Sequence, residues 1–146
     1  MHTIQIPRDF KEFLKLLIAN DARFLVIGGY AVNAFGHIRN TVDLDIWIAA
    51  DAENRSRVVQ AIRSFAFPNA GVEMFDRPDA MVRMGVPPLR IEVLQKIAGV
   101  EFDDWSRRVI LADEDIQIPM ISLDDLKKNK KAAGRPKDLL DVDGLS

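Results

Sequence analysis

The fold is decided by residues 24–48, which read FLVIGGYAVNAFGHIRNTVDLDIWI. The first four are apolar strand formers that stop at two glycines, so they predict a short buried strand. Residues 30–35 predict a short helix that ends at Gly36, because glycine is favoured just past a helix end. Over residues 43–48 polar and apolar side chains alternate, and this period of two predicts a second strand with two chemically different faces.

Regular patterns on both sides of this stretch complete the predicted fold. Apolar residues at helical spacing predict helices, and alternation or short apolar runs predict strands. The predicted helices are 8–19, 53–65, 122–133 and 136–142, and the predicted strands are 81–85, 89–94, 109–112 and 116–118. We therefore expect an α/β (α+β) fold, a mixed sheet flanked by helices, in one domain over residues 1–146, with a C-terminal helical segment from about 122 to 146.

The composition narrows the classes of function. The 146 residues are 48% hydrophobic and 29% charged, which is ordinary for a globular protein. The absence of cysteine excludes disulfides, a thiol nucleophile and a cysteine-ligated zinc site, and two histidines give a histidine-based triad little to build from. The apolar run at 13–19 is too short to span a bilayer and does not resemble a signal peptide, so we expect a cytoplasmic protein without membrane contact.

Asp43 and Asp45 are the most informative pair in the central stretch. Two residues apart on a strand, they share a face, with Cα atoms roughly 6.5–7 Å apart. Neighbouring carboxylates on one face repel each other, and a divalent cation removes that conflict. The alternative is an edge strand with a solvated acidic face. The pair predicts a Mg²⁺ site in which both aspartates are metal ligands and catalytic residues.

The two glycines between the first strand and the helix predict a phosphate-binding turn. Gly28 and Gly29 allow a ligand to approach the backbone closely, and free N–H groups at a helix start attract phosphate; a purely steric role is the alternative. Arg39 and Thr41 precede the aspartates with the same alternation, so both are expected to face the site, with Arg39 as a bidentate phosphate ligand. An ion pair between Arg39 and Asp43 is the other interpretation.

Glu92 lies in a second alternating segment, on the face opposite its apolar neighbours. If that strand lies beside the one carrying Asp43 and Asp45, three carboxylates converge and can hold one or two Mg²⁺ ions. Glu92 is then a metal ligand, a general base, or both. The alternative is a solvent-facing carboxylate paired with Arg90. The sequence leaves the adjacency of the two strands open.

The chain resembles the nucleotidyltransferase fold superfamily (the polymerase-beta-like group) at Gly28-Gly29-Tyr30-Ala31, at Gly36 and over residues 39–46, RNTVDLDI. It is most similar to the small bacterial members grouped with abortive-infection and toxin–antitoxin nucleotidyltransferases. A second segment, from Leu126 through Lys130 to Asp138, resembles the C-terminal helical motif of that group. The resemblance covers most of the chain and is weakest between residues 67 and 88.

The resemblance implies a Mg²⁺-dependent enzyme that moves a nucleoside monophosphate from an NTP to an acceptor hydroxyl and releases pyrophosphate. It assigns the triphosphate to Gly28 and Gly29, and it assigns Mg²⁺ to the two aspartates. Glu92 matches the third carboxylate, where many members carry aspartate, and the second glycine replaces the serine that the family often has. The acceptor stays open between RNA, a protein side chain and a small molecule.

By the same resemblance, Lys130 approaches the nucleotide, together with Arg135 and Lys137. Lys130 follows Leu126 by four residues and so lies on the inward, apolar face of its helix. A bound phosphate would explain a lysine at this position; the alternative is that its side chain snorkels to water. The basic run around it also raises an RNA-binding module as a third hypothesis, although charge runs are more often solvated faces.

A second function stays open beside the enzyme. The chain is short for a family whose active members often add a domain that holds the acceptor. This favours a catalytically inactive binding protein that acts as a partner in a toxin–antitoxin-type system. The intact Asp-x-Asp pattern favours the enzyme. A homodimer that completes the site, or a cognate antitoxin-type partner, is the assembly expected for so short a chain.

Overall fold

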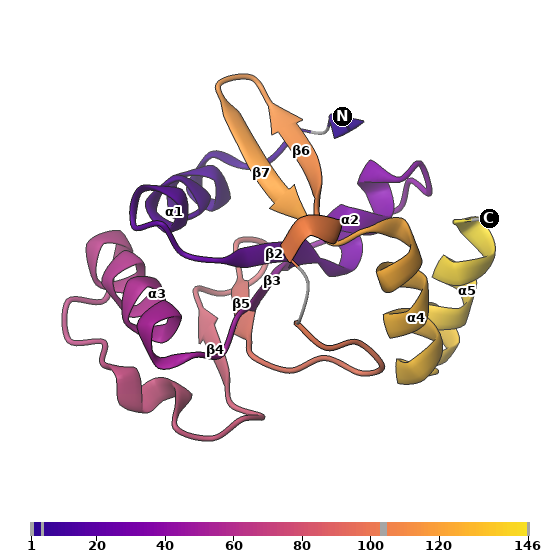
Figure 1. Ribbon diagram of the computed structural model, residues 1–146. Helices are drawn as coiled ribbons and strands as arrows, with labels where there is room; N and C mark the ends of the chain where they lie inside the picture. Colours follow the sequence, from indigo (N-terminus) through magenta and orange to yellow (C-terminus); the bar gives the residue numbers. More distant parts are fainter. Residues whose placement is uncertain (1, 4, 103–104, 146) are drawn as a thin grey trace.

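The computed structural model describes residues 2–3, 5–102 and 105–145, and its strands form one mixed sheet (Figure 1). The strands are β1 His2–Thr3, β2 Phe24–Ile27, β3 Leu44–Ile48, β4 Met81–Met84, β5 Ile91–Leu94, β6 Val109–Asp113 and β7 Ile116–Met120. The helices are α1 Arg8–Ala19, α2 Gly28–Ala34, α3 Ala52–Phe65, α4 Leu123–Ala133 and α5 Pro136–Gly144, with 3₁₀ turns at Val72–Phe75 and Trp105–Arg107. The expected α/β fold, a mixed sheet flanked by helices, is confirmed.

The sheet order is β1-β6-β7-β2-β3-β5-β4. The central strand β3 pairs antiparallel with β2 and parallel with β5. Its register places Asp45 beside Glu92, and the antiparallel pairing of β5 with the edge strand β4 places Arg83 beside Glu92. Residues paired across neighbouring strands share a face of the sheet, so all three side chains lie on the same side.

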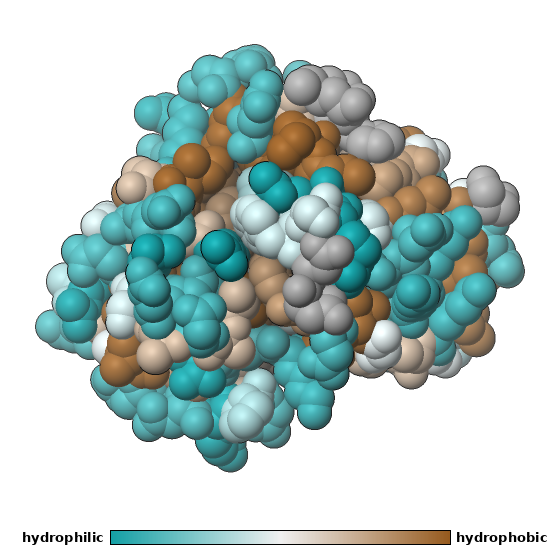
Figure 2. All heavy atoms as spheres, in the orientation of Figure 1, coloured by the Kyte–Doolittle hydropathy of each residue, from teal (hydrophilic) through white to brown (hydrophobic). Residues whose placement is uncertain are grey.

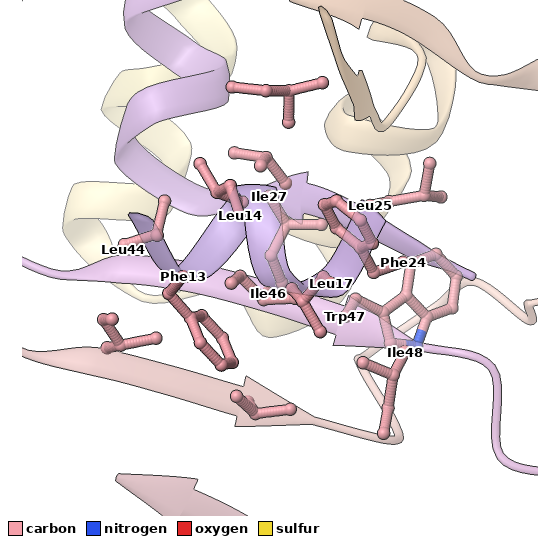
Figure 3. Packing of buried hydrophobic residues seen from close by; sticks show 14 of the residues in the cluster. Phe13, Leu14, Leu17, Phe24, Leu25, Ile27, Leu44, Ile46, Trp47 and Ile48 are labelled. Atoms are coloured by element: carbon pink, nitrogen blue, oxygen red, sulfur yellow. The ribbon is translucent and has the colours of Figure 1, made fainter. Parts of the chain in front are cut away.

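The opposite face of the sheet carries the hydrophobic core. Leu44, Ile46 and Ile48 are fully buried, and Figure 3 shows them packed among side chains of α1. Helix α1 contributes Phe13 and Leu17, both fully buried, because its apolar residues repeat at helical spacing. Burial of each such side chain contributes about 1.5–3 kcal/mol, so this face holds β3 firmly in place.

Helices α4 and α5 pack against each other near α2, on the other side of the molecule from α1 and α3 (Figure 1). The predicted start of α4 is confirmed, since the Ser122 hydroxyl accepts a hydrogen bond from the Asp125 N–H at 3.2 Å. The helix ends at Gly134, which adopts a left-handed conformation with φ of 68°.

Helix α5 has an inverted amphipathic pattern. Asp138, Asp141 and Leu145 are buried, whereas Leu139 and Leu140 are 48% and 66% exposed. Hydrophobic spheres accordingly appear on the outer side of α5, at the right of Figure 2. Two buried carboxylates on one helix face require cationic partners, and these belong to the candidate site described below.

Several predicted boundaries differ from the structure. Helix α2 begins at Gly28, two residues before the predicted start, and β5 begins at Ile91, two residues after it. The short strand β1 was not predicted; it exists through parallel pairing with the distant strand β6, which no local pattern announces. Among the described residues, no helix is long and apolar enough to cross a membrane.

Candidate functional site

A cavity of about 490 Å³ lies over the polar face of β3 and β5. Its floor carries Asp43, Asp45 and Glu92, so the three carboxylates named from the sequence border one space. Asp45 and Glu92 lie directly opposite each other in neighbouring parallel strands. The two strands, whose adjacency the sequence left open, are therefore adjacent.

Cationic side chains make up much of the cavity wall. They come from four separate segments: β4, the loop before β5, the loop after β5, and the α4–α5 corner. The six are Arg83, Arg90, Lys96, Lys130, Arg135 and Lys137. A carboxylate floor under a cationic wall suits a ligand that carries both a metal ion and phosphates, because each charge then meets its opposite.

Asp45 is the most perturbed carboxylate of the cavity. Burial, with the negative charges of Glu92 and Asp43, raises the pKa of Asp45 from 3.8 to about 7, and the charge of Lys130 opposes this only in part. Its Oδ1 is buried and has no hydrogen-bond partner among the described residues. A hydrogen bond with Glu92 also contributes to the raised pKa, so a proton or a cation beside this carboxylate is favourable.

Two arginines hold the other two carboxylates. Arg90 forms a bidentate pair with Asp43, with Nε–Oδ1 and Nη2–Oδ2 distances of 3.2 and 2.7 Å. Glu92 Oε1 lies 3.1 Å from Arg83 Nε and 3.5 Å from Arg90 Nε. The pairing of Glu92 with Arg90 is therefore real, but Arg90 is bound mainly to Asp43.

The carboxylate set fits Mg²⁺ in its chemistry. Asp43, Asp45 and Glu92 offer only oxygen ligands, which this ion prefers, and Asp45 Oδ1 has no competing partner among the described residues. The arrangement is not a ready metal centre: no group of three or more His, Asp or Glu side chains in the described part of the chain is placed to hold an ion. Two of the three carboxylates, Asp43 and Glu92, are instead paired with arginines.

Gly28 lines the cavity, and its lack of a side chain keeps the Asp45 carboxylate in place. The residue has a φ of 67°, and a Cβ atom there would overlap Asp45 Oδ2. Gly29 is also required to be small, but a Cβ on it would meet Thr41 Oγ1 and Arg39 Nη1. The two glycines therefore serve different contacts, with Gly28 beside the carboxylates and Gly29 beneath the loop before β3.

Arg39 and Thr41 were expected to continue the alternation of β3 toward the site. Strand β3 begins only at Leu44, and the loop before it follows no strand period. Arg39 instead binds Asp141 on α5, with Nε–Oδ1 and Nη2–Oδ2 distances of 2.8 and 3.0 Å. The suggested Arg39–Asp43 pair is wrong, because Arg90 takes Asp43.

Lys130 does line the cavity, and its burial has an additional cause. Its Nζ lies 3.3 Å from Asp138 Oδ1 and 3.2 Å from Asp141 Oδ2. Burial by itself would raise the pKa of both aspartates. The pKa of Asp138 is nevertheless lowered by hydrogen bonds and charge from Arg135 and Lys130. The pKa of Asp141 is lowered in the same way by Arg39 and Lys130. Lys130 is thus held by α5 at the cavity wall and does not snorkel to water.

Sequence reasoning missed Arg83 and the inward role of Asp141. The alternation of residues 81–84 was a usable signal for Arg83, since it places that side chain opposite the buried Val82. For α5 the signal was the spacing of Asp138, Asp141 and Leu145 along one helix face. The usual amphipathic pattern expects apolar residues on the buried face, and it therefore favours burial of Leu139 and Leu140.

No protein-family model and no curated protein matches this chain. The assignment of function therefore depends on the geometry and chemistry of the cavity.

Proposed function

We propose that the chain is a Mg²⁺-dependent nucleotidyltransferase that moves a nucleoside monophosphate from an NTP to an acceptor hydroxyl and releases pyrophosphate. The observation that carries this proposal is the buried, unpartnered Oδ1 of Asp45, which lies beside Glu92 under a cationic cavity wall. Few ligands need both features; a polyphosphate with its divalent cation is one. The likeness of residues 28–46 to the nucleotidyltransferase signature supports the same reaction.

Each part of the cavity has a role in this reaction. Asp43 and Asp45 would hold Mg²⁺, which would neutralise charge on the phosphates and favour ionisation of the acceptor hydroxyl. Glu92 accepts the proton of that hydroxyl, whose oxygen bonds to the α-phosphorus as the bond to the β-phosphate oxygen breaks. The cationic wall, including Lys130, binds the departing pyrophosphate. The acceptor is RNA, a protein side chain or a small molecule.

Calorimetry with a non-hydrolysable NTP tests the proposal. The wild-type protein is titrated with Mg²⁺ or with EDTA, beside an Asp45→Asn, Glu92→Gln double variant that keeps the shape of the site and removes its charge. We expect Mg²⁺-dependent binding that the double variant loses. Asp21→Asn is the matched control, since this exposed aspartate lies outside the cavity. A folded wild-type protein that binds no NTP in the presence of Mg²⁺ contradicts the proposal.

A second function is a nucleotide-binding protein without catalysis, acting as a partner in a toxin–antitoxin-type system. The observation that favours it is the bidentate Arg90–Asp43 pair, which occupies one of the two expected metal ligands. Turnover of labelled NTPs with a range of acceptors separates the two functions. Binding that is equal with Mg²⁺ and with EDTA, without transfer to any acceptor, supports the second.

A further inference from the structure

The guanidinium of Arg90 lies where two carboxylates of the cavity meet. It binds both oxygens of Asp43, and its Nε lies 3.5 Å from Glu92 Oε1. A guanidinium stays charged throughout the ordinary pH range. The Arg90 side chain is 32% exposed and borders the cavity itself. The cavity therefore provides space into which the guanidinium can turn once it leaves Asp43.

We propose that Arg90 is an exchangeable internal cation: it holds Asp43 while no divalent ion is bound, and it turns onto the phosphates of the nucleotide when the ion takes Asp43. This inference rests on the proposed function and adds a consequence to it. A divalent cation alone binds weakly, because it must displace an arginine. A divalent cation with a polyphosphate binds more tightly, because the displaced guanidinium gains a new anionic partner.

The exchange follows from the charges on the cavity floor. Asp45 lies beside Glu92 in the neighbouring strand, and Asp43 lines the same cavity, so without a cation the repulsion between the three carboxylates makes the floor unfavourable. Arginine supplies a planar fork that matches a carboxylate or a phosphate equally well. The same group can therefore leave Asp43 for a phosphate without losing its bidentate contact. Asp45 Oδ1, which lacks a partner among the described residues, remains for the ion in either state.

Arg83 does not share this role. Among the described residues its ion pair is with Glu92, through Nε at 3.1 Å, and its side chain is 59% exposed. A single contact from an exposed arginine holds a carboxylate weakly. Arg83 therefore provides a local control, because its removal takes one positive charge from the cavity and leaves the Arg90–Asp43 pair intact.

The test measures Mn²⁺ binding by calorimetry and electron paramagnetic resonance, with inorganic tripolyphosphate as the second ligand. Mn²⁺ accepts the oxygen ligands that suit Mg²⁺, and tripolyphosphate reports on phosphate contacts whatever the base preference. The variants are Arg90→Gln, Arg83→Gln and the distant control Arg57→Gln, whose residue pairs with Glu53 on the surface of α3.

We expect Arg90→Gln to bind Mn²⁺ alone about tenfold more tightly than the wild type, the size of one charge-assisted pair. Tripolyphosphate should strengthen Mn²⁺ binding by the wild type and do so about tenfold less in Arg90→Gln, because the two ligands are linked through Arg90. Arg57→Gln should match the wild type, and Arg83→Gln should change Mn²⁺ affinity much less than Arg90→Gln does.

Three results overturn the exchange. If Arg90→Gln and wild type bind Mn²⁺ equally while both bind tripolyphosphate, Arg90 does not compete for Asp43, and the proposed function survives. If Arg83→Gln and Arg90→Gln tighten Mn²⁺ binding alike, only local charge matters. If neither wild type nor variant binds Mn²⁺ or tripolyphosphate, the proposed function fails as well. Should Arg90→Gln not fold, Arg90→Lys gives the same test, since lysine makes one contact in place of the fork.

Discussion

Replacement of Asp45 by asparagine should stabilise the metal-free protein at neutral and alkaline pH. The folded protein raises the pKa of Asp45 from 3.8 to about 7, chiefly through burial and the charges of Glu92 and Asp43. In the unfolded chain the group ionises near its ordinary value. Between these two values the folded state therefore binds more protons than the unfolded state, and stability falls as the pH rises.

The magnitude follows from the width of that window. At about 1.4 kcal/mol for each pH unit, the rise of the Asp45 pKa to about 7 corresponds to as much as about 4 kcal/mol. The cost is absent below the unfolded pKa, grows through the window and is complete above pH of about 7. Asparagine has almost the same shape and never ionises. Asp45→Asn should therefore match the wild type near a pH of about 3 and exceed it by about 4 kcal/mol near a pH of about 8.

Guanidinium unfolding in EDTA at several pH values measures this difference directly. Acidic groups outside the cavity titrate alike in both proteins, so the comparison isolates Asp45 together with the two carboxylates coupled to it, Asp43 and Glu92. Asp21→Asn serves as the control, because its side chain is 93% exposed. An equal difference in unfolding free energy between wild type and Asp45→Asn at every pH would refute the reasoning, since it would show that Asp45 ionises in the folded protein as it does in the unfolded chain.

Three further predictions concern other parts of the site and its supports. Gly28→Ala should destabilise the protein by more than the backbone strain of roughly 1–2 kcal/mol and abolish tripolyphosphate binding, because its Cβ displaces the carboxylate of Asp45. Gly36→Ala is the control: with φ of 104° and open space around it, it should show the backbone strain alone. Urea unfolding measures the stability of both variants, and calorimetry measures their binding of tripolyphosphate. Lys130→Met should cost about 3 kcal/mol in urea unfolding, since it removes a cation from two buried aspartates, and an unchanged midpoint would contradict a structural role for this pair. Ser122→Ala should cost about 1 kcal/mol by thermal unfolding, whereas Ser122→Asp should keep the helix cap and the stability.

The sequence by itself determined most of the local structure. Alternation over residues 43–48 gave a strand with an acidic face, and the structure places Asp45 on the polar side of β3, as expected. The helix start at Ser122 was also predicted correctly, and a helix end beside Gly134 follows from the same kind of signal. These features depend on contacts between residues a few positions apart, so the local sequence is enough to predict them.

Only the tertiary structure decided which strands and charges meet. The sequence could not place β5 beside β3, and that adjacency brings Glu92 to Asp45. Arg90 reaches Asp43 across 47 positions, and Arg39 reaches Asp141 across 102. Several cations and carboxylates offer equally good local partners in the sequence, so the pairs are chosen by where packing of the core brings their backbones.

The inverted face of α5 shows the physical reason most clearly. Local amphipathicity puts Leu139 and Leu140 inside, and the structure puts Asp138 and Asp141 there instead. Their burial is favourable because Lys130 from α4 and Arg39 from the loop before β3 join Arg135, at the start of α5, and compensate for the lost hydration. A pattern along one helix can contain Arg135, but it cannot contain the two distant cations. The side that a charged face takes is therefore a property of the assembled fold, whereas the helix itself is a property of its sequence.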